Sequence, residues 1–173
     1  GKNIASCSRD NTIKIWNSQT GKLLHTLKGH IYCVSSVAYS PNSKYIASGS
    51  HDKTIKIWDS DLGQLLRTLE GNTDFVMSVT YSLDGKFIAS GFFDGTIKIW
   101  DSRTGKLLHT IFENTKYVYS LAFSLDDKNI ASCSNDSTIK IWKNPIFEDR
   151  WTTKKNSLLL RKNCNINKCF HVF

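Results

Sequence analysis

Apolar and polar residues alternate in four short segments of the chain, each of which reads TIKIW. In one of them, Ile55 and Ile57 alternate with the polar residues Thr54 and Lys56, and Trp58 follows. A period of two places successive side chains on opposite faces of a strand. Each segment is therefore predicted to be a half-buried β-strand.

Further apolar runs surround this strand, and turn residues such as Pro41, Asn42 and Gly63 separate them. The runs are VSSVAYS (34–40), YIASGS (45–50) and QLLRTL (64–69). Four short strands joined by tight turns predict an antiparallel meander. No stretch of the chain has the 3.6-residue period of an amphipathic helix, so no helix is expected within the repeated pattern.

The four-strand pattern recurs every 42 residues without an insertion. Three residue types mark the repeat: Ser6, Ser48, Ser90 and Ser132; Asp10, Asp52, Asp94 and Asp136; and Trp16, Trp58, Trp100 and Trp142. One four-stranded sheet cannot bury both of its faces alone, whereas stacked copies can, and a radial stack of such sheets is a propeller. We therefore expect an all-β fold that forms a partial β-propeller.

The repeated text also resembles a known consensus. GKLLHTLKGH followed by VSSVAYSPNSKYIASGSHDKTIKIWD is similar to the WD-repeat (β-transducin-type) family, with Gly-His near one end and Trp-Asp at the other. The resemblance covers about three and a half repeats in residues 1–143. It implies that the last strand of each sequence repeat forms the outer edge of the preceding blade. The predicted domains are a propeller segment with blades at roughly 1–28, 29–70, 71–112 and 113–143, and a divergent basic tail at 144–173 that is partly disordered.

The recurring Ser and Asp, with His30 ahead of them in blade two, have the residue types of a catalytic triad. A catalytic set normally occurs once in a protein, whereas this one recurs in every blade, so we interpret it as structural. We expect a buried hydrogen-bonded chain from the Trp indole through Ser and His to Asp, a use of these positions that the resemblance also implies. The residues assigned to it are His30, Ser48, Asp52 and Trp58 in blade two, Ser6, Asp10 and Trp16 in blade one, Ser90, Asp94 and Trp100 in blade three, and Ser132, Asp136 and Trp142 in blade four. Asn72 and Asn114 replace the His in blades three and four, so these chains are expected to be weaker.

Function in a repeat scaffold resides in variable residues displayed on a constant frame. Such residues lie before each inner strand, at its start, and before the turn Asp, and those predicted to bind a partner are Arg9, His51, Phe75, Met77, Phe93, Tyr117 and Tyr119. Most are aromatic, and exposed aromatic side chains often mark an interface. Packing between adjacent blades is the alternative explanation. Phe93 is the strongest candidate, because Phe92 beside it already serves the sheet.

No catalytic motif of the P-loop, HExxH or GxSxG type occurs in the chain. We therefore expect a non-catalytic scaffold that binds a protein or peptide on its top face, with no cofactor, no metal site and no membrane partner. Two alternatives stay open. In the first alternative, the chain is the regulatory part of a larger enzyme such as an NTPase or a kinase. In the second, its basic tail makes weak contact with nucleic acid.

The net charge of +8 is concentrated in the tail, where seven Lys/Arg and two Asp/Glu follow from residue 143 onward. The lysine that recurs on the third strand of each blade is expected to be solvated, and these residues are Lys14, Lys56, Lys98 and Lys140. This distribution disfavours nucleic acid as a partner. In the tail, Cys164, Cys169 and His171 lack a fourth ligand for zinc.

Cys7 and Cys133 occupy the position that Gly49 and Gly91 hold in the other repeats, so they are interpreted as small packing residues. Such cysteines favour a reduced setting, cytoplasmic or nuclear, over a disulfide-forming one.

Blade one lacks an inner strand, because the chain opens inside a repeat. Two tail segments have the composition to complete a ring: SLLLRK (157–162) as the outer strand of blade four, and KCFHVF (168–173) as the inner strand of blade one. A ring of four would force blades shaped for a wide circle into a tight one. We therefore expect an open arc of about four blades, whose exposed sheet faces lead to self-association.

Overall fold

The computed structural model describes residues 2–112, 116–147 and 158–160, which form four antiparallel sheets and no helix. Blade one has three strands, β1 (Asn3–Cys7), β2 (Thr12–Asn17) and β3 (Leu23–Lys28). Blade two has β4 (Val34–Tyr39), β5 (Tyr45–Ser50), β6 (Ile55–Asp59) and β7 (Leu65–Leu69). Blade three has β8 (Val76–Tyr81), β9 (Phe87–Phe92), β10 (Ile97–Asp101) and β11 (Leu107–Ile111). Blade four has β12 (Val118–Phe123), β13 (Asn129–Ser134), β14 (Ile139–Lys143) and β15 (Leu158–Leu160).

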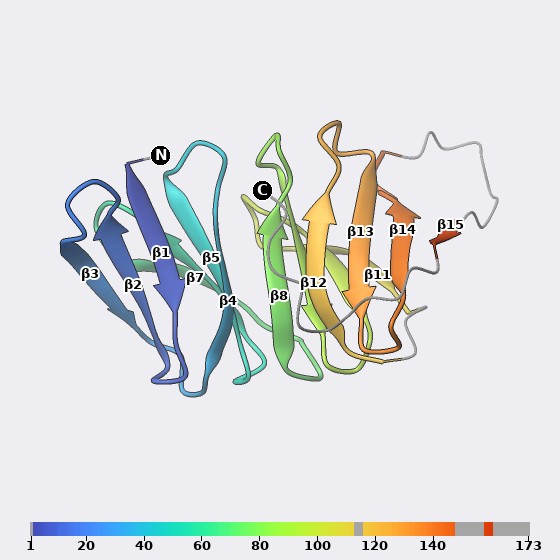
Figure 1. The fold of residues 1–173 in the computed structure, drawn as a ribbon, viewed down its shortest axis with the longest axis horizontal. Coiled ribbons are helices and arrows are strands. Elements are labelled where there is room, and N and C mark those ends of the chain that lie inside the picture. The colour runs from blue at the N-terminus through green and yellow to red at the C-terminus, as the bar shows by residue number, and fades with distance from the viewer. Residues whose placement is uncertain (1, 113–115, 148–157, 161–173) are drawn as a thin grey trace.

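Within each sheet the strands follow one another in chain order, so every blade is a meander. The inner strands β4, β8 and β12 lie next to one another, with β1 beside β4 (Figure 1). The sheets therefore form a row that does not close on itself, which confirms the predicted partial propeller with an open arc.

Blade four is completed by a strand from the tail. β15 pairs antiparallel with β14, with Leu160 opposite Ile139 and Leu158 opposite Ile141. The SLLLRK segment therefore contributes the outer strand of blade four, a role that its composition allowed but that the sequence left open. The KCFHVF segment, whose composition would suit an inner strand for blade one, lies outside the described residues.

The hydrophobic core lies between the blades and consists of three clusters, one at each junction. Ile13, Ile15 and Leu27 of blade one pack against blade two through Val34, Ile46 and Trp58. The equivalent residues form the next junction, where Ile55, Ile57 and Leu69 pack against Val76, Ile88 and Trp100. The third junction joins Ile97 and Ile99 to Val118, Ile130 and Trp142. Each alternating strand thus has one face for the preceding blade and one for the following blade.

The glycines of the second strand allow this close approach. A Cβ atom on Gly49 would lie 2.4 Å from Cγ1 of Val76, and one on Gly91 would lie 2.6 Å from Cγ1 of Val118. No real Cβ contact is that short, so the following inner strand requires a residue without a side chain at these two places. The expectation that this position takes a small residue agrees with the packing.

The position of the core predicts different costs for one substitution in two blades. Ile46 and Ile4 occupy the same place in the repeat, but Ile46 is 0% exposed and Ile4 is 55% exposed, because none of the described sheets packs against that side of blade one. In dilute solution, Ile46→Ala should lower the free energy of unfolding by about 2–5 kcal/mol, since it leaves a cavity. Ile4→Ala should change it by less than about 0.5 kcal/mol. Urea denaturation of the two variants measures both values, and equal losses would contradict a core located between the blades.

Candidate functional site

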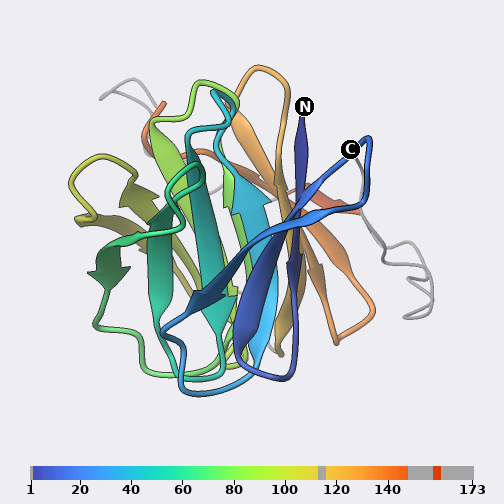
Figure 2. The same cartoon turned by 90° about the vertical axis from the view of Figure 1, so that its left-hand side faces the viewer.

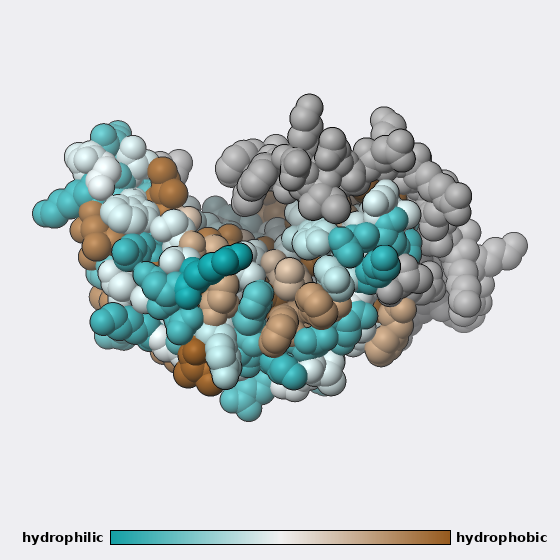
Figure 3. Space-filling model, turned by 60° about the horizontal axis from the view of Figure 1, so that its bottom comes forward, coloured by the Kyte–Doolittle hydropathy of each residue, from teal (hydrophilic) through white to brown (hydrophobic). Residues whose placement is uncertain are grey.

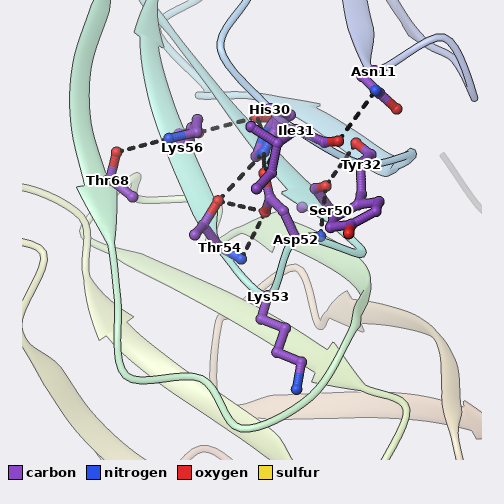
Figure 4. A network of polar contacts seen from close by, with 12 residues as sticks. Asn11, His30, Ile31, Tyr32, Ser50, Asp52, Lys53, Thr54, Lys56 and Thr68 are labelled. Carbon is purple, nitrogen blue, oxygen red and sulfur yellow. Dashed lines mark hydrogen bonds and ion pairs between the residues drawn. The ribbon is translucent and has the colours of Figure 1, made fainter.

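The repeated polar residues of blade two form a continuous hydrogen-bonded chain, and Figure 4 shows the end of it at His30, Asp52 and Thr54. Trp58 donates its indole N–H to Oγ of Ser48 at 2.8 Å, and the same hydroxyl lies 2.8 Å from Nε2 of His30. Nδ1 of His30 lies 2.7 Å from Oδ2 of Asp52. The chain ties two strands of the blade to the segment that enters it, because His30 precedes β4 while the other members belong to β5, β6 and the turn between them.

A neutral imidazole satisfies every contact in this chain. The Ser48 hydroxyl donates to Nε2 of His30, and Nδ1–H donates to the Asp52 carboxylate. Burial lowers the pKa of His30, and this effect outweighs the opposing influence of Asp52. Burial by itself raises the pKa of Asp52, but hydrogen bonds from Thr54 and His30 reverse this and lower it. A neutral His beside an ionised Asp is therefore the favoured state near neutral pH.

The constellation is not accessible for catalysis. Ser48 is completely buried and His30 nearly so, and the Ser hydroxyl already contacts both the imidazole and the indole of Trp58. A nucleophile must reach a substrate carbonyl, and no substrate can approach this oxygen in the folded blade. The geometry therefore suits a structural tie rather than a triad.

Parts of the same arrangement recur in the other blades. The Trp indole donates to the Ser hydroxyl in each of them, with distances of 2.8 Å for Trp16–Ser6, 2.8 Å for Trp100–Ser90 and 2.9 Å for Trp142–Ser132. The turn Asp accepts hydrogen bonds from both the amide and the hydroxyl of the Thr two residues later: Thr12 with Asp10, Thr96 with Asp94, and Thr138 with Asp136. The Asp thus holds the turn in every blade, whether or not a His reaches it.

Blade three replaces the His with a different set of contacts. The side-chain amide of Asn72 donates to the backbone oxygens of Lys53 and Leu69. The ammonium group of Lys98 donates to the backbone oxygen of Gly71 at 3.0 Å and lies 3.5 Å from Oδ1 of Asn72. Burial lowers the pKa of Lys98, although the nearby Asp94 acts in the opposite direction. Asn114, the equivalent in blade four, lies outside the described residues.

The expectation of a solvated row of lysines is wrong. Lys98 and Lys140 are buried, and Lys14 and Lys56 are half-buried. The ammonium groups of Lys14, Lys98 and Lys140 lie 5.8–6.0 Å from the ring centroid of the Trp two residues later in the same strand. At such distances a cation is attracted to the face of the ring, and the long aliphatic stem covers apolar surface. These lysines therefore belong to the frame and do not form a cationic surface.

Five of the residues predicted to bind a partner form one continuous row of rings, which we call the aromatic row: His51, Phe75, Phe93, Tyr117 and Tyr119. His51 stacks on Phe75 with centroids 4.8 Å apart, and Phe75 meets Phe93 edge to face at 5.9 Å. Phe93 stacks on Tyr117 at 4.0 Å, and Tyr117 meets Tyr119 edge to face at 5.8 Å. The row crosses blades two, three and four along the edge of the sheets that carries the turn Asp residues.

Backbone hydrogen bonds fix the turns that carry the aromatic row. The amide of His51 donates to the backbone oxygen of Cys33, that of Phe93 to Phe75, and that of Asn135 to Tyr117. The hydroxyl of Tyr119 donates to Oδ1 of Asn135 at 2.8 Å, which anchors the last ring. The same bond therefore recurs in three blades and holds each turn against the segment that precedes the inner strand.

The row combines packing between blades with exposure to solvent. Phe75 is 36% exposed and Phe93 is 39% exposed, whereas Tyr117 and Tyr119 are half-buried. Figure 3 brings this edge of the sheets forward and shows apolar side chains gathered in patches among polar ones. Of the remaining predicted residues, Arg9 lies exposed in the turn of blade one and Met77 lies half-buried in β8. Both explanations considered for the aromatic positions thus describe part of the geometry.

Two classes of site are absent from the part of the chain that the structure describes. No three His, Cys, Asp or Glu side chains gather there in a way that could hold a metal ion. None of these residues forms a helix that could span a lipid bilayer.

The sequence model described as "WD domain, G-beta repeat" matches the chain four times, at residues 1–17, 21–59, 63–101 and 105–143. The chain belongs to the WD-repeat family. The four matches end at the strands that carry the recurring Trp. Each of the three longer matches contributes its first strand to one blade and its remaining strands to the next, whereas the resemblance implied that the last strand of each repeat belongs to the preceding blade.

Several curated proteins contain segments similar to this WD-repeat chain. GID complex subunit 7 from Schizosaccharomyces pombe is 50% identical over 42 residues, which are 24% of this chain and 8% of that protein. Nuclear distribution protein PAC1 from Mycosarcoma maydis is 50% identical over 44 residues, or 25% of this chain and 10% of that protein. F-box-like/WD repeat-containing protein TBL1X from Mus musculus is 45% identical over 42 residues, covering 24% and 8%. The similar segment thus spans no more than a tenth of each of these three relatives.

Two features of the WD repeats were not foreseen from the sequence. The contact of Lys98 with Gly71 and Asn72 joins β10 to the segment between β7 and β8, 26 and 27 residues earlier in the chain. The bond between Tyr119 and Asn135 fixes a ring that the sequence marked only as variable. The sequence held one signal for the first feature: Asn72 stands where blade two has His30, in the same repeat as the buried Lys98.

The His30 contacts predict a stability that depends on pH. Replacing His30 with Asn, the residue found in blade three, should cost about 1–3 kcal/mol near pH 7, because Ser48 and Asp52 each lose a buried partner. The folded-state pKa of His30 is lowered, so its contribution is complete above about pH 6.5, the ordinary pKa of His, and is lost as the pH falls. The gap between wild type and His30→Asn should therefore narrow on acidification to about pH 5, still above the range in which Asp52 titrates. Urea denaturation across this range measures the gap, and a gap that widens would contradict a neutral His30.

Proposed function

We propose that this chain is a non-catalytic scaffold that binds a partner protein or peptide through the aromatic row. The observation that supports the proposal is the continuity of the row. Five rings from three blades contact one another in sequence, and its two most exposed members, Phe75 and Phe93, are aromatic side chains partly open to solvent. Aromatic groups held in this way supply much of the binding energy at protein interfaces.

The row is prepared for binding before any partner arrives. Recurring backbone bonds hold its turns, and stacking between Phe93 and Tyr117 restricts both rings. A surface that is already ordered loses little conformational entropy on association. Because the rings follow one another across blades two to four, the surface suits an extended segment with apolar side chains that lies across several blades. The names of two relatives fit such a role, since one is a subunit of a complex and another carries an F-box-like region beside its WD repeats.

We also propose that nucleic acid is not the partner and that the chain acts in the cytoplasm or the nucleus. Lys98 and Lys140 are buried and Lys14 and Lys56 are half-buried, which disfavours the recurring lysines as a binding surface for nucleic acid. A cytoplasmic or nuclear site fits Cys7 and Cys33, which form no disulfide within the described part of the chain.

The proposal predicts that a peptide ligand depends on Phe93 and Tyr117. Peptides selected from a random phage-displayed library on the immobilised chain would be synthesised, and their dissociation constants measured by fluorescence polarisation. Phe93→Ala and Tyr117→Ala should each weaken binding by roughly tenfold to thirtyfold, as expected when a central aromatic group is removed. Both variants should melt within a few degrees of the wild type, since neither ring belongs to the clusters between the blades.

A matched control is available at the opposite end of the blades. Leu125 is 88% exposed in the turn between β12 and β13, so Leu125→Ala removes exposed apolar surface away from the aromatic row. This variant should bind the selected peptides as the wild type does. Peptides that bind all the variants equally, or a library that yields no enriched peptide, would contradict the proposal.

A further inference from the structure

The loop between β3 and β4 exposes two neighbouring apolar side chains. Ile31 is 72% exposed and Tyr32 is 61% exposed, both more than any member of the aromatic row. A single exposed apolar side chain is ordinary on a protein surface, whereas neighbouring ones suggest an interface. The same positions of blade three hold the polar residues Thr73 and Asp74. The apolar pair is therefore a feature of the loop that enters blade two and does not recur in blade three.

Hydrogen bonds from two blades hold the backbone of this loop (Figure 4). The amide of Ile31 donates to Oδ2 of Asp52 at 3.1 Å, and its carbonyl oxygen accepts the side-chain amide of Asn11 at 3.3 Å. The carbonyl oxygen of Tyr32 accepts the hydroxyl of Ser50 at 2.9 Å. The two apolar side chains thus extend into solvent from an ordered backbone, which loses little conformational entropy when a partner binds.

The loop lies between the first ring of the aromatic row and blade one. Cys33, next to Tyr32, accepts the backbone amide of His51 at 2.9 Å through its carbonyl oxygen. On the other side, the loop runs beside the turn between β1 and β2, where the amide of Val34 donates to the carbonyl oxygen of Ser8 at 3.1 Å (Figure 2). The apolar pair therefore extends the aromatic row toward blade one along the same edge of the sheets.

Basic side chains lie close to the apolar pair. Lys28 is exposed and precedes Ile31 by three residues. Lys53 is also exposed and directly follows the Asp that binds the amide of Ile31. The turn of blade one that contacts the loop adds the exposed Arg9 and one exposed acid, Asp10. Three cations and one anion thus give this end of the surface a positive charge.

The matching positions of blade three carry the opposite charge. The segment that enters this blade has Glu70 where the segment entering blade two has Lys28, and it also contains Asp74. Asp94 directly follows Phe93, the most exposed ring of the aromatic row, and is exposed as well. The surface is therefore basic beside the apolar pair and acidic beside the rings of blade three.

We propose that Ile31 and Tyr32 form a second anchor for the partner segment that the aromatic row binds. This segment places acidic side chains beside Lys28 and Lys53. The inference rests on the proposed function, because the aromatic row supplies the other anchor. The charges also set the direction of the segment, since in the reverse direction its acidic side chains would meet the carboxylates of blade three. The tail of the chain does not have this chemistry, because seven Lys/Arg and two Asp/Glu follow from residue 143 onward.

Serine variants of the full chain test the second anchor. Ile31→Ser and Tyr32→Ser remove exposed side chains and keep the backbone groups that hold the loop. Each should weaken binding of the phage-selected peptides by about fivefold to tenfold in fluorescence polarisation. Both should melt as the wild type does, because neither side chain is buried. Leu62→Ser is the matched control, since Leu62 is 64% exposed in the turn between β6 and β7, at the opposite edge of the same blade, and it should leave binding unchanged.

A second selection tests the charge of the partner. Peptides enriched on the wild type should carry Asp or Glu at one end of an apolar stretch more often than the unselected library does. On a chain with both Lys28→Glu and Lys53→Glu, this enrichment should disappear and Lys or Arg should take its place. Binding of the acidic peptides to the wild type should also weaken as the salt concentration rises from about 50 to about 500 mM, because exposed charges are screened.

The outcomes separate this inference from the proposed function. If Phe93→Ala weakens binding while both serine variants bind as the wild type does, the second anchor is wrong and the aromatic row stands. If none of the three variants weakens binding, the proposed function fails as well. If only the serine variants weaken binding, one segment does not span both sites and the inference is overturned. Peptides without an acidic bias, or rich in Lys and Arg as the tail is, would contradict the proposed chemistry of the partner.

Discussion

A sheet of four short strands has two faces and too little thickness to bury either of them by itself. This chain meets that constraint by placing its apolar clusters between the sheets, so that Ile55 and Ile57 face one neighbour while Ile46 and Trp58 face the other. Strand alternation, the small residues at Gly49 and Gly91, and the period of 42 residues all follow from the need to stack. The stability of each blade is therefore shared with its neighbours.

The same constraint separates structural polar residues from those available for binding. The chain from Trp58 to Asp52 is buried within its blade, where the Ser, His and Asp satisfy one another and hold the turn. The aromatic row lies along the edge of the sheets that carries the turn Asp residues, and its members Phe75 and Phe93 stay partly exposed there. Because the frame is rigid and repeated, changes at Phe93 or Tyr117 alter a surface without altering the clusters that support it. A repeat scaffold can in this way vary its partners while keeping its fold.

Much of the fold could be predicted from the sequence because one local pattern specifies it. TIKIW indicates a strand, its recurrence indicates stacking, and the positions before the turn Asp indicate the rings that meet in the aromatic row. The burial of Lys98 could not be predicted, since its ammonium group contacts Gly71 and Asn72 in the segment that enters the blade, 26 and 27 residues earlier in the chain. The sequence also left open whether the rings pack or face solvent. The half-exposed Phe93, stacked on Tyr117, shows that one residue can do both.

Hydrogen exchange in dilute solution tests most directly whether the blades share their cores. β1 and β5 carry nearly the same text, NIASC and YIASGS, and pair in the same register with TIKIW strands. If stability comes from stacking, the amides of β5 and β6, in a blade covered on both sides, exchange much more slowly than those of β1 and β2, in a blade covered on one side. Equal protection of the two pairs would show that each sheet is stable by itself and would contradict the account.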